Sequence, residues 1–299
     1  MSIFDWYVQN EYWFAAVQLT LAMLGMGATL KLSDFRDVAR EPKGVTIGVL
    51  VQIVAVPLVT LLLIQSVGLD VGVLIGIALI AAIPGGTVSN IYTYLAGGNI
   101  PLSISVTALT TLGCLLTTPI ILGVLIDDYM PADFEMPAAQ IAVEIGVYLL
   151  LPLVVGMMCY RFLPQWAELI SRIGVRGSMF VILLIVIGSG GAGRLDTAAF
   201  GGFNVMMIAS FFVVLVLIGA LTPALAGLKR RDTIAIEIEV AVRNTNLGLL
   251  IKASLFPAIA GQADPIGDFV LFTLLLYGAL QIFIGLLWVW IRRRQGAVA

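Results

Sequence analysis

Long apolar runs separated by short polar segments make up most of this chain. Nine such runs lie at residues 12–30, 44–66, 71–96, 101–126, 137–162, 173–192, 203–227, 232–260 and 266–291. Most are long enough to cross a hydrocarbon layer of about 30 Å as helices. Because their apolar residues are continuous rather than alternating, helices are favoured over a transmembrane barrel. The pattern predicts an all-α polytopic membrane protein, with one transmembrane domain over residues 1–299.

The basic residues fall in alternate connections between these runs. With the N-terminus outside, the inside segments hold most of the 16 Lys and Arg residues: Lys31, Arg36, Arg40, Lys43, Arg161, Arg172, Arg176, Lys229, Arg230, Arg231, Arg292, Arg293 and Arg294. Arg194 alone falls in an outside connection, and the outer segment 127–135 is acidic. The positive-inside rule then predicts nine spans with the C-terminus in the cytoplasm. Residues 1–11 hold no basic residue, so no cleavable signal peptide is expected.

Composition excludes several classes of function. Only 11% of residues are charged and 60% are apolar, whereas about a quarter of a soluble domain is charged. The sequence pI of about 5.1 argues against nucleic-acid binding. The chain has no histidine, which removes histidine-based catalysis and zinc sites. Its two cysteines give no disulfide framework. The acidic outer loops and short tails indicate a bacterial inner-membrane protein.

Two of the runs are interrupted. The third contains Pro84-Gly85-Gly86-Thr87, where proline removes a helix hydrogen bond and the glycines weaken the remainder. The eighth places three ionisable and three short polar side chains within residues 237–246. A charge at membrane depth costs several kcal/mol, so Glu239 is a functional candidate.

The order of the runs suggests an internal inverted repeat. Runs one to four pair with runs six to nine at an offset of five, so partners cross the membrane in opposite directions. The halves would span about 12–126 and 173–291, linked by a helix at about 137–162. The two interrupted runs occupy matching places, as in transporters whose broken helices cross near the midplane.

Some of these features also have structural explanations. A Pro-Gly-Gly sequence alone is typical of a simple kink. Ser103 and Thr107 are four residues apart on one helix face, a pattern that alone also suits helix packing. Glu237 points away from Glu239, which favours a structural role near the inner surface.

Glu144 and Lys252 are also charged residues within predicted spans. The sequence does not separate a structural partner from a cavity-lining group for either of them. Their roles are left open.

The chemistry of the interrupted runs suits two different ligands. Freed carbonyls, hydroxyls and a carboxylate are hard oxygen ligands appropriate to Na⁺. The helix that restarts after Gly86 presents free N–H groups, which suit an organic anion. Together they describe a sodium-coupled anion symporter.

Pro84-Gly85-Gly86-Thr87-Val88-Ser89-Asn90, Ser103, Thr107 and Glu239-Val240-Ala241-Val242-Arg243-Asn244 carry a family resemblance. In order and spacing the chain resembles the bile acid:sodium symporter family, as a bacterial homologue of the apical sodium-dependent bile acid carriers. The resemblance implies a panel domain and a core domain. It also implies that this nine-span chain lacks the first helix of ten-span members.

The resemblance also implies roles for individual residues. The first sodium site would use Ser89, Asn90, Ser103, Thr107 and Glu239. The second would use Gln52, the Glu239 carboxylate, the carbonyls of Val240 and Val242, and the side chain at position 243. By this resemblance, substrate would lie near Thr87, Val88 and Asn244, while Arg243 and Tyr277 are candidate substrate contacts of this chain's own.

Position 243 departs from the family pattern, which usually has glutamine there. Arg243 has no lone pair for a cation, and it would pair with Glu239 four residues earlier. We therefore expect Arg243 to replace the second sodium, leaving one Na⁺ rather than two. The alternative is that Arg243 faces the cavity and binds an anion. In the last run, this chain has Leu274-Leu275-Leu276-Tyr277 where family members often have polar residues facing the cavity. Only Tyr277 and Gln281 of this run could therefore offer polar contacts to a substrate.

These inferences predict a secondary active transporter that moves a small organic anion with sodium by alternating access. The substrate would be bile-acid-like, keto-acid-like or pantoate-like. A sodium-independent uniporter or exchanger of the same fold is the alternative. An enzyme is disfavoured because no Gly-x-Ser-x-Gly, His-Glu-x-x-His or P-loop motif is present. A sensor is disfavoured by the absence of a soluble output domain. The expected partners are the substrate and the lipid bilayer, with no nucleic acid and no obligate protein partner.

Overall fold

The described part of the chain, residues 2–31, 42–131 and 134–297 of a computed structural model, is almost entirely helical and contains no β-strand. Its elements are α1 (Ile3–Gln9), α2 (Glu11–Gly27), α4 (Pro42–Leu50), η2 (Val51–Ala55), α5 (Val56–Ser66), α6 (Val71–Ala82), α7 (Thr87–Leu95), α8 (Ile100–Ile126), η3 (Asp127–Tyr129), α9 (Ala138–Glu144), η4 (Ile145–Leu150), α10 (Leu151–Phe162), α11 (Pro164–Gly191), α12 (Thr197–Leu225), α13 (Arg230–Ala241), α14 (Thr245–Leu255) and α15 (Pro265–Ala297). Segments η2 and η4 are π-helical and η3 is a 3₁₀ turn.

Six continuous helical segments of the described chain are long and apolar enough to cross a membrane. They are Pro42–Ser66, Ile100–Tyr129, Ala138–Phe162, Pro164–Gly191, Thr197–Leu225 and Pro265–Gln295. Their outer faces carry large exposed apolar side chains, such as Phe180 and Leu183 on α11. An apolar outer face is what a helix presents to lipid. The predicted all-helical class of membrane protein is therefore supported.

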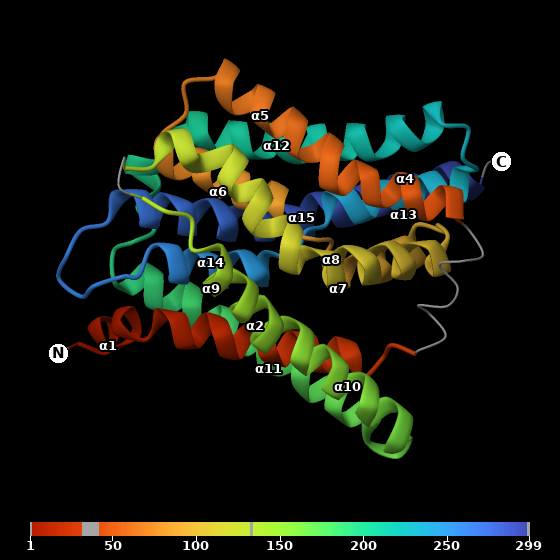
Figure 1. The fold of residues 1–299 in the computed structure, drawn as a ribbon, viewed down its shortest axis with the longest axis horizontal. Coiled ribbons are helices and arrows are strands. Elements are labelled where there is room, and N and C mark those ends of the chain that lie inside the picture. Colours follow the sequence, from red (N-terminus) through yellow and green to blue (C-terminus); the bar gives the residue numbers. More distant parts are fainter. Residues whose placement is uncertain (1, 32–41, 132–133, 298–299) are drawn as a thin grey trace.

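The helices form two packed groups (Figure 1). We call α2, α9, η4, α10 and α11 the α2 group, because α10 and α11 both pack along α2. The crossing group consists of α4, η2, α5, α6, α7, α8, α12, α13, α14 and α15; within it α12 packs on α13, and α6 packs on α15 and α8. Helix α14 of the crossing group also packs on α2, so it links the two groups.

Small residues bring the helices of the α2 group close together. A methyl group on Gly156 of α10 would sit 2.8 Å from the Cα of Gly27 in α2, and one on Gly174 of α11 would sit 2.8 Å from the Cα of Gly25. Side chains at these positions would push the backbones apart. Close packing of small residues is a common basis of helix association in lipid.

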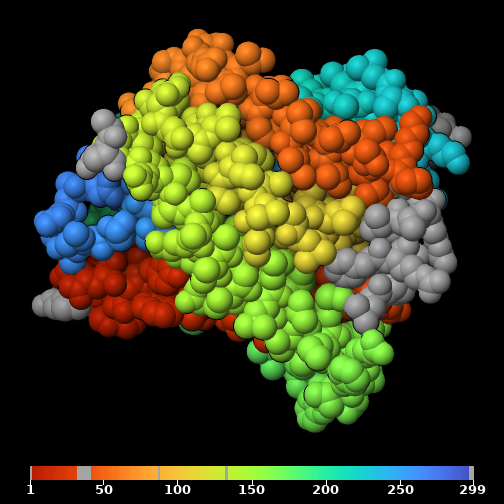
Figure 2. Space-filling model, in the orientation of Figure 1, coloured from red at the N-terminus to blue at the C-terminus, as the bar shows by residue number. Residues whose placement is uncertain are grey.

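Helix α11 begins earlier than its hydropathy predicts. The sequence places a span at 173–192 after an inside connection, whereas the helix starts at Pro164, directly after Leu163. Proline suits the first turn, and an exposed Glu168–Arg172 ion pair of 2.6 Å supports the polar start of the helix. The end of α10 and the start of α11 project as a green lobe in Figure 2. Amphipathic turns thus extend this helix beyond its apolar stretch.

A cluster of four charged side chains, three of them buried, joins the two groups at the end where α2 begins. Lys252 of α14 is fully buried and donates to both carboxylate oxygens of Glu11 on α2, at 3.0 and 2.9 Å. Arg194, in the connection after α11, contacts Glu11 at 3.1 Å and Asp268 of α15 at 2.5 Å. We call these four residues the charge cluster. Lys252 is therefore a partner of a buried acid.

Candidate functional site

The two interrupted helices meet at their interruptions. Helix α6 ends at Ala82 and α7 begins at Thr87, while α13 ends at Ala241 and α14 begins at Thr245. The two gaps lie antiparallel and exchange two backbone hydrogen bonds, Gly86 N to Val242 O at 2.8 Å and Asn244 N to Pro84 O at 3.0 Å.

Three carbonyl groups freed at the first interruption find donors. The Ala82 carbonyl accepts from Thr118 Oγ1 at 2.9 Å, and the Ile83 carbonyl accepts from Arg243 Nη1 at 3.1 Å. The Pro84 carbonyl accepts from Asn244 N. Since no water solvates peptide groups in lipid, this accounting is what allows an open backbone at this depth.

Glycine is required where the two gaps touch. A methyl group on Gly86 would lie 2.9 Å from the Arg243 carbonyl oxygen, and one on Gly85 would run into the Glu239 carboxylate. The Gly86 neighbour is backbone, which cannot turn aside. The crossing thus depends on the absence of a side chain.

We expect Gly86→Ala to lower stability by about 1–3 kcal/mol, the usual cost of overpacking. The measurement is the thermal midpoint of the purified protein in detergent. Gly113→Ala is the matched control, because a methyl group there meets nothing within 4 Å. Helix propensity predicts an unchanged or slightly higher midpoint for that control. Equal midpoints for the two variants would mean that the crossing tolerates a side chain.

Glu239 lies on α13 beside this crossing and is fully buried. Its Oε1 accepts from Thr107 Oγ1 at 2.6 Å, and its Oε2 accepts from Ser103 Oγ at 3.0 Å. Both hydroxyls come from α8, where a spacing of four residues puts them on one face. The structure brings these three predicted residues together.

Helix α7 completes an oxygen-rich cluster around Ser103. Ser103 Oγ lies 2.8 Å from Asn90 Oδ1, and Thr93 Oγ1 donates to Ser103 Oγ at 3.2 Å. Ser89, the residue before Asn90, is buried, and its hydroxyl donates to the Gly86 carbonyl at 2.6 Å. Thr93 was not predicted from the sequence, although it lies three residues after Asn90 on the same helix face.

The hydroxyl proton of Ser103 cannot serve both of its acceptors, Asn90 Oδ1 and Glu239 Oε2. A cation between these oxygens, or a turned Asn90 amide, completes the pattern. The donor set of hydroxyls, an amide oxygen and one carboxylate suits a hard monovalent cation. No group of three His, Cys, Asp or Glu residues that could hold a metal ion occurs in the described part of the chain.

Arg243 lies in the second interruption and is buried. Its Nη1 donates to Gln52 Oε1 at 3.2 Å and to the Ile83 carbonyl, while its backbone N donates to Gln281 Oε1 at 3.0 Å. Its Nε and Nη2 have no hydrogen-bond partner. Gln52 Oε1 also accepts from Gly85 N at 3.1 Å. The Arg243 guanidinium therefore lies beside the Gln52 side-chain amide and is hydrogen-bonded to it.

The predicted direct pair between Arg243 and Glu239 is absent from the structure. No ion pair within 4.0 Å joins these two described residues, although their charges attract each other at longer range. A spacing of four aligns side chains only on a continuous helix. Because α13 ends at Ala241, the chain turns before Arg243 and carries its side chain toward Gln52.

The other predicted ligands are placed as follows. The Val240 side chain is buried, and the Val242 carbonyl already accepts from Gly86 N. Asn244 is buried and its side chain caps α14 by accepting from Leu247 N at 3.4 Å. Val88 is 38% exposed, and the Thr87 side chain lies outside the described part of the structure.

Tyr277 and Glu237 have clear structural contacts. The Tyr277 hydroxyl donates to the Ala241 carbonyl at 2.6 Å, where α13 ends. Glu237 points away from the crossing and accepts from Arg292 at 2.7 and 2.9 Å and from Trp288 Nε1 at 2.7 Å. Glu237 therefore joins α13 to α15, as its opposite placement on the helix predicts.

The architecture described above defines a class: a membrane-embedded helical protein with crossing interrupted helices and a buried oxygen-rich site. Comparison with known proteins identifies one family. Residues 16–192 match the model of the Sodium Bile acid symporter family. That match covers more than half of the chain, and the chain belongs to this family.

Named relatives agree with this assignment. The chain is 28% identical to the uncharacterized sodium-dependent transporter YocS of Bacillus subtilis, over 89% of this chain and 80% of that protein. It is 31% identical to the human ileal sodium/bile acid cotransporter over 58% of this chain and 50% of that one. It is 29% identical to the probable chloroplastic sodium/metabolite cotransporter BASS2 of rice, over 80% of this chain. The match spans 56% of the rice protein's length. The chain is thus an integral membrane protein of a sodium-dependent transporter family.

Proposed function

We propose that this protein is a secondary active transporter that moves a small organic anion together with one Na⁺. The observation that carries the proposal is the buried Glu239 carboxylate, held by two hydroxyls of α8 beside the crossing of two interrupted helices. A buried carboxylate without a paired cation is costly, and a coupling ion supplies the missing charge.

The sodium site in this proposal is formed by Ser89, Asn90, Ser103, Thr107 and Glu239. Thr93 adds a hydroxyl that the sequence alone did not indicate. These oxygens come from α7, α8 and α13, so an ion among them would hold three elements of the crossing together.

Arg243 takes the place of a second sodium in this proposal. Its guanidinium donates to Gln52, the side chain that the family resemblance assigns to the second ion. It carries a fixed positive charge and lacks a lone pair for a cation. One coupling ion rather than two follows. The organic anion would bind beside the crossing, near the start of α7 and Asn244.

Transport would proceed by movement of the crossing group against the α2 group. In this proposal the chain has nine membrane spans in an inverted repeat, and its N-terminus lies outside. Halves at about 12–126 and 173–291 would provide the two crossing helices. Ion and substrate would act by favouring one arrangement over the other. A bacterial inner membrane is the proposed location.

Uptake by proteoliposomes tests sodium coupling directly. Taurocholate, pantoate and pyruvate are first screened by thermal shift, because a ligand at about 100 times its Kd stabilises by about 2.7 kcal/mol. For the anion that stabilises, we expect uptake to fall at least about tenfold when choline replaces sodium. Uptake that is equal in both salts would favour the sodium-independent uniporter or exchanger, in which Arg243 serves as a permanent cation.

A further inference from the structure

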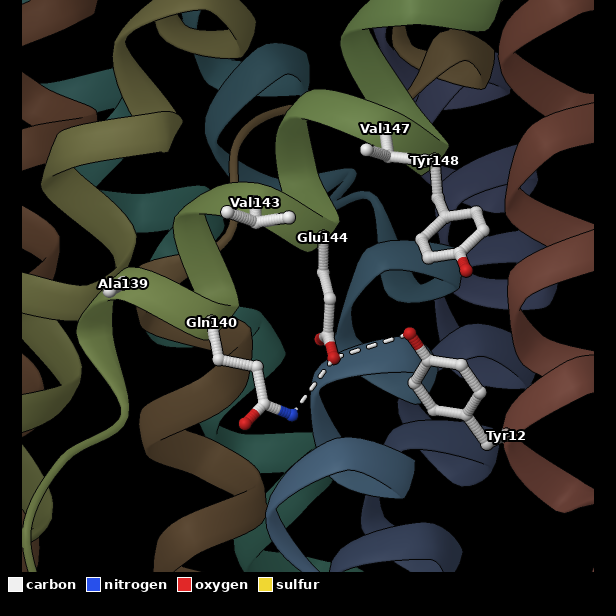
Figure 3. A pocket seen from close by; sticks show the side chains of 7 residues that line it. All are labelled: Tyr12, Ala139, Gln140, Val143, Glu144, Val147 and Tyr148. Atoms are coloured by element: carbon white, nitrogen blue, oxygen red, sulfur yellow. Dashed lines mark hydrogen bonds between the residues drawn. The ribbon is translucent and has the colours of Figure 1, made fainter.

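A second candidate site lies between α2 and the α9–η4 segment, away from the helix crossing. It is a cavity of about 410 Å³ whose lining includes Tyr12, Gln140, Glu144 and Tyr148. Figure 3 shows the Glu144 side chain reaching down between Gln140 and Tyr12. None of these side chains takes part in the proposed transport site.

Glu144 is a buried carboxylate, 5% exposed, that contacts only neutral donors. Its Oε1 accepts from Tyr12 Oη at 3.2 Å, from Gln140 Nε2 at 3.1 Å and from Ser254 Oγ at 2.8 Å. Its Oε2 is buried and has no hydrogen-bond partner.

The charge of Glu144 therefore lacks a counter-charge among the described residues. No lysine or arginine of that part of the chain forms an ion pair with it. Burying an unpaired carboxylate costs several kcal/mol, and a cation at Oε2 would remove that cost.

The remaining walls of the cavity indicate what kind of cation fits. The rings of Tyr12 and Tyr148 are edge-to-face, with centroids 6.1 Å apart, and aromatic ring faces attract cations. Val143 and Val147 add apolar surface to the lining, and both are exposed. An apolar and aromatic lining disfavours a hydrated metal ion, and a volume of about 410 Å³ exceeds what a bare ion needs.

We propose that this cavity binds the ammonium group of an amine, with Glu144 as its counter-ion and the two tyrosine rings as its walls. The inference goes beyond the proposed transport function and does not depend on it. The amine could belong to a soluble molecule or to the headgroup of an ethanolamine phospholipid, since both present the same ammonium group. Ser254 belongs to α14 of the crossing group, so the site also lies where the two groups touch.

Ethanolammonium chloride is the probe for this site. Titration is followed by intrinsic fluorescence, because Trp13 lies 5.5 Å from Tyr12 between ring centroids. At constant ionic strength we expect saturable binding that Glu144→Gln weakens at least about tenfold, or about 1.4 kcal/mol. Glu168→Gln removes an equal but exposed charge and should bind like wild type. Tyr148→Leu keeps the carboxylate but removes one aromatic wall, and it should also weaken binding. It tests the site independently if Glu144→Gln does not fold.

The source of the amine is separated by repeating the titration in nanodiscs. Competition by phosphatidylethanolamine but not by phosphatidylglycerol would identify a lipid headgroup, and lack of competition would identify a soluble amine. The proposal is overturned if ethanolammonium does not saturate, if sodium chloride gives the same response, or if Glu144→Gln and Tyr148→Leu bind normally.

Discussion

Glu239→Gln should abolish the dependence of transport on sodium. Glutamine keeps the shape of the side chain but removes the negative charge, so a cation beside Ser103 and Thr107 loses its only anionic ligand. Sodium affinity should fall by at least about a hundredfold, which corresponds to about 2.7 kcal/mol. The measurement is the sodium concentration at half-maximal stabilisation and at half-maximal uptake.

Glu237→Gln is the matched control for this variant. It removes a second buried carboxylate from the same helix, but one that faces Arg292 and Trp288. We expect lower stability with an unchanged sodium response, since a partly exposed Arg292 loses its ion pair. If Glu239→Gln retains the sodium response of wild type, the ion binds elsewhere and the proposed site is wrong.

Arg243→Gln should raise the number of coupled sodium ions from one to two. Without the guanidinium, Gln52 Oε1 and the Ile83 carbonyl lose a donor and become available to a cation. The charge that Arg243 supplies would then have to come from a bound ion. The Hill coefficient for sodium in uptake should rise from about 1 toward about 2, its limit for two sites.

Arg243→Lys separates charge from shape in this experiment. Lysine keeps the positive charge, so sodium stoichiometry should stay at one even if the hydrogen bonds to Gln52 weaken. An unchanged sodium stoichiometry in Arg243→Gln, with a raised KM for the anion, would instead assign Arg243 to substrate binding. The same stoichiometry and anion affinity in all three proteins would contradict both roles.

The sequence was informative wherever a single residue type has few uses at membrane depth. Pro84-Gly85-Gly86 predicted an interrupted helix because proline and glycine weaken the backbone locally. Ser103 and Thr107 were predicted on one face because helical spacing is local geometry. Glu239 was predicted as a functional residue because a charge at membrane depth has a high energetic cost.

Features that depend on distant contacts or on the direction of an irregular segment were not predictable. Arg243 was expected to meet Glu239 because four residues separate them, but α13 ends first. The pairing of Glu11 with Lys252 joins residues 241 positions apart, and no local pattern encodes it. Helix α11 was predicted too short because hydropathy does not register its polar first turns.

The charge cluster holds α2 to α14 by an ion pair at the end of the molecule where α2 begins. Separating α2 from α14 at this end would break the ion pair between Lys252 and Glu11. The two unpaired charges would then have to be solvated, or their burial would cost free energy. At this end Glu11 of α2 is paired with Lys252 of α14, and Arg194 bridges Glu11 to Asp268 of α15. Any movement that separates α2 from α14 at this end must therefore break the ion pair between Glu11 and Lys252.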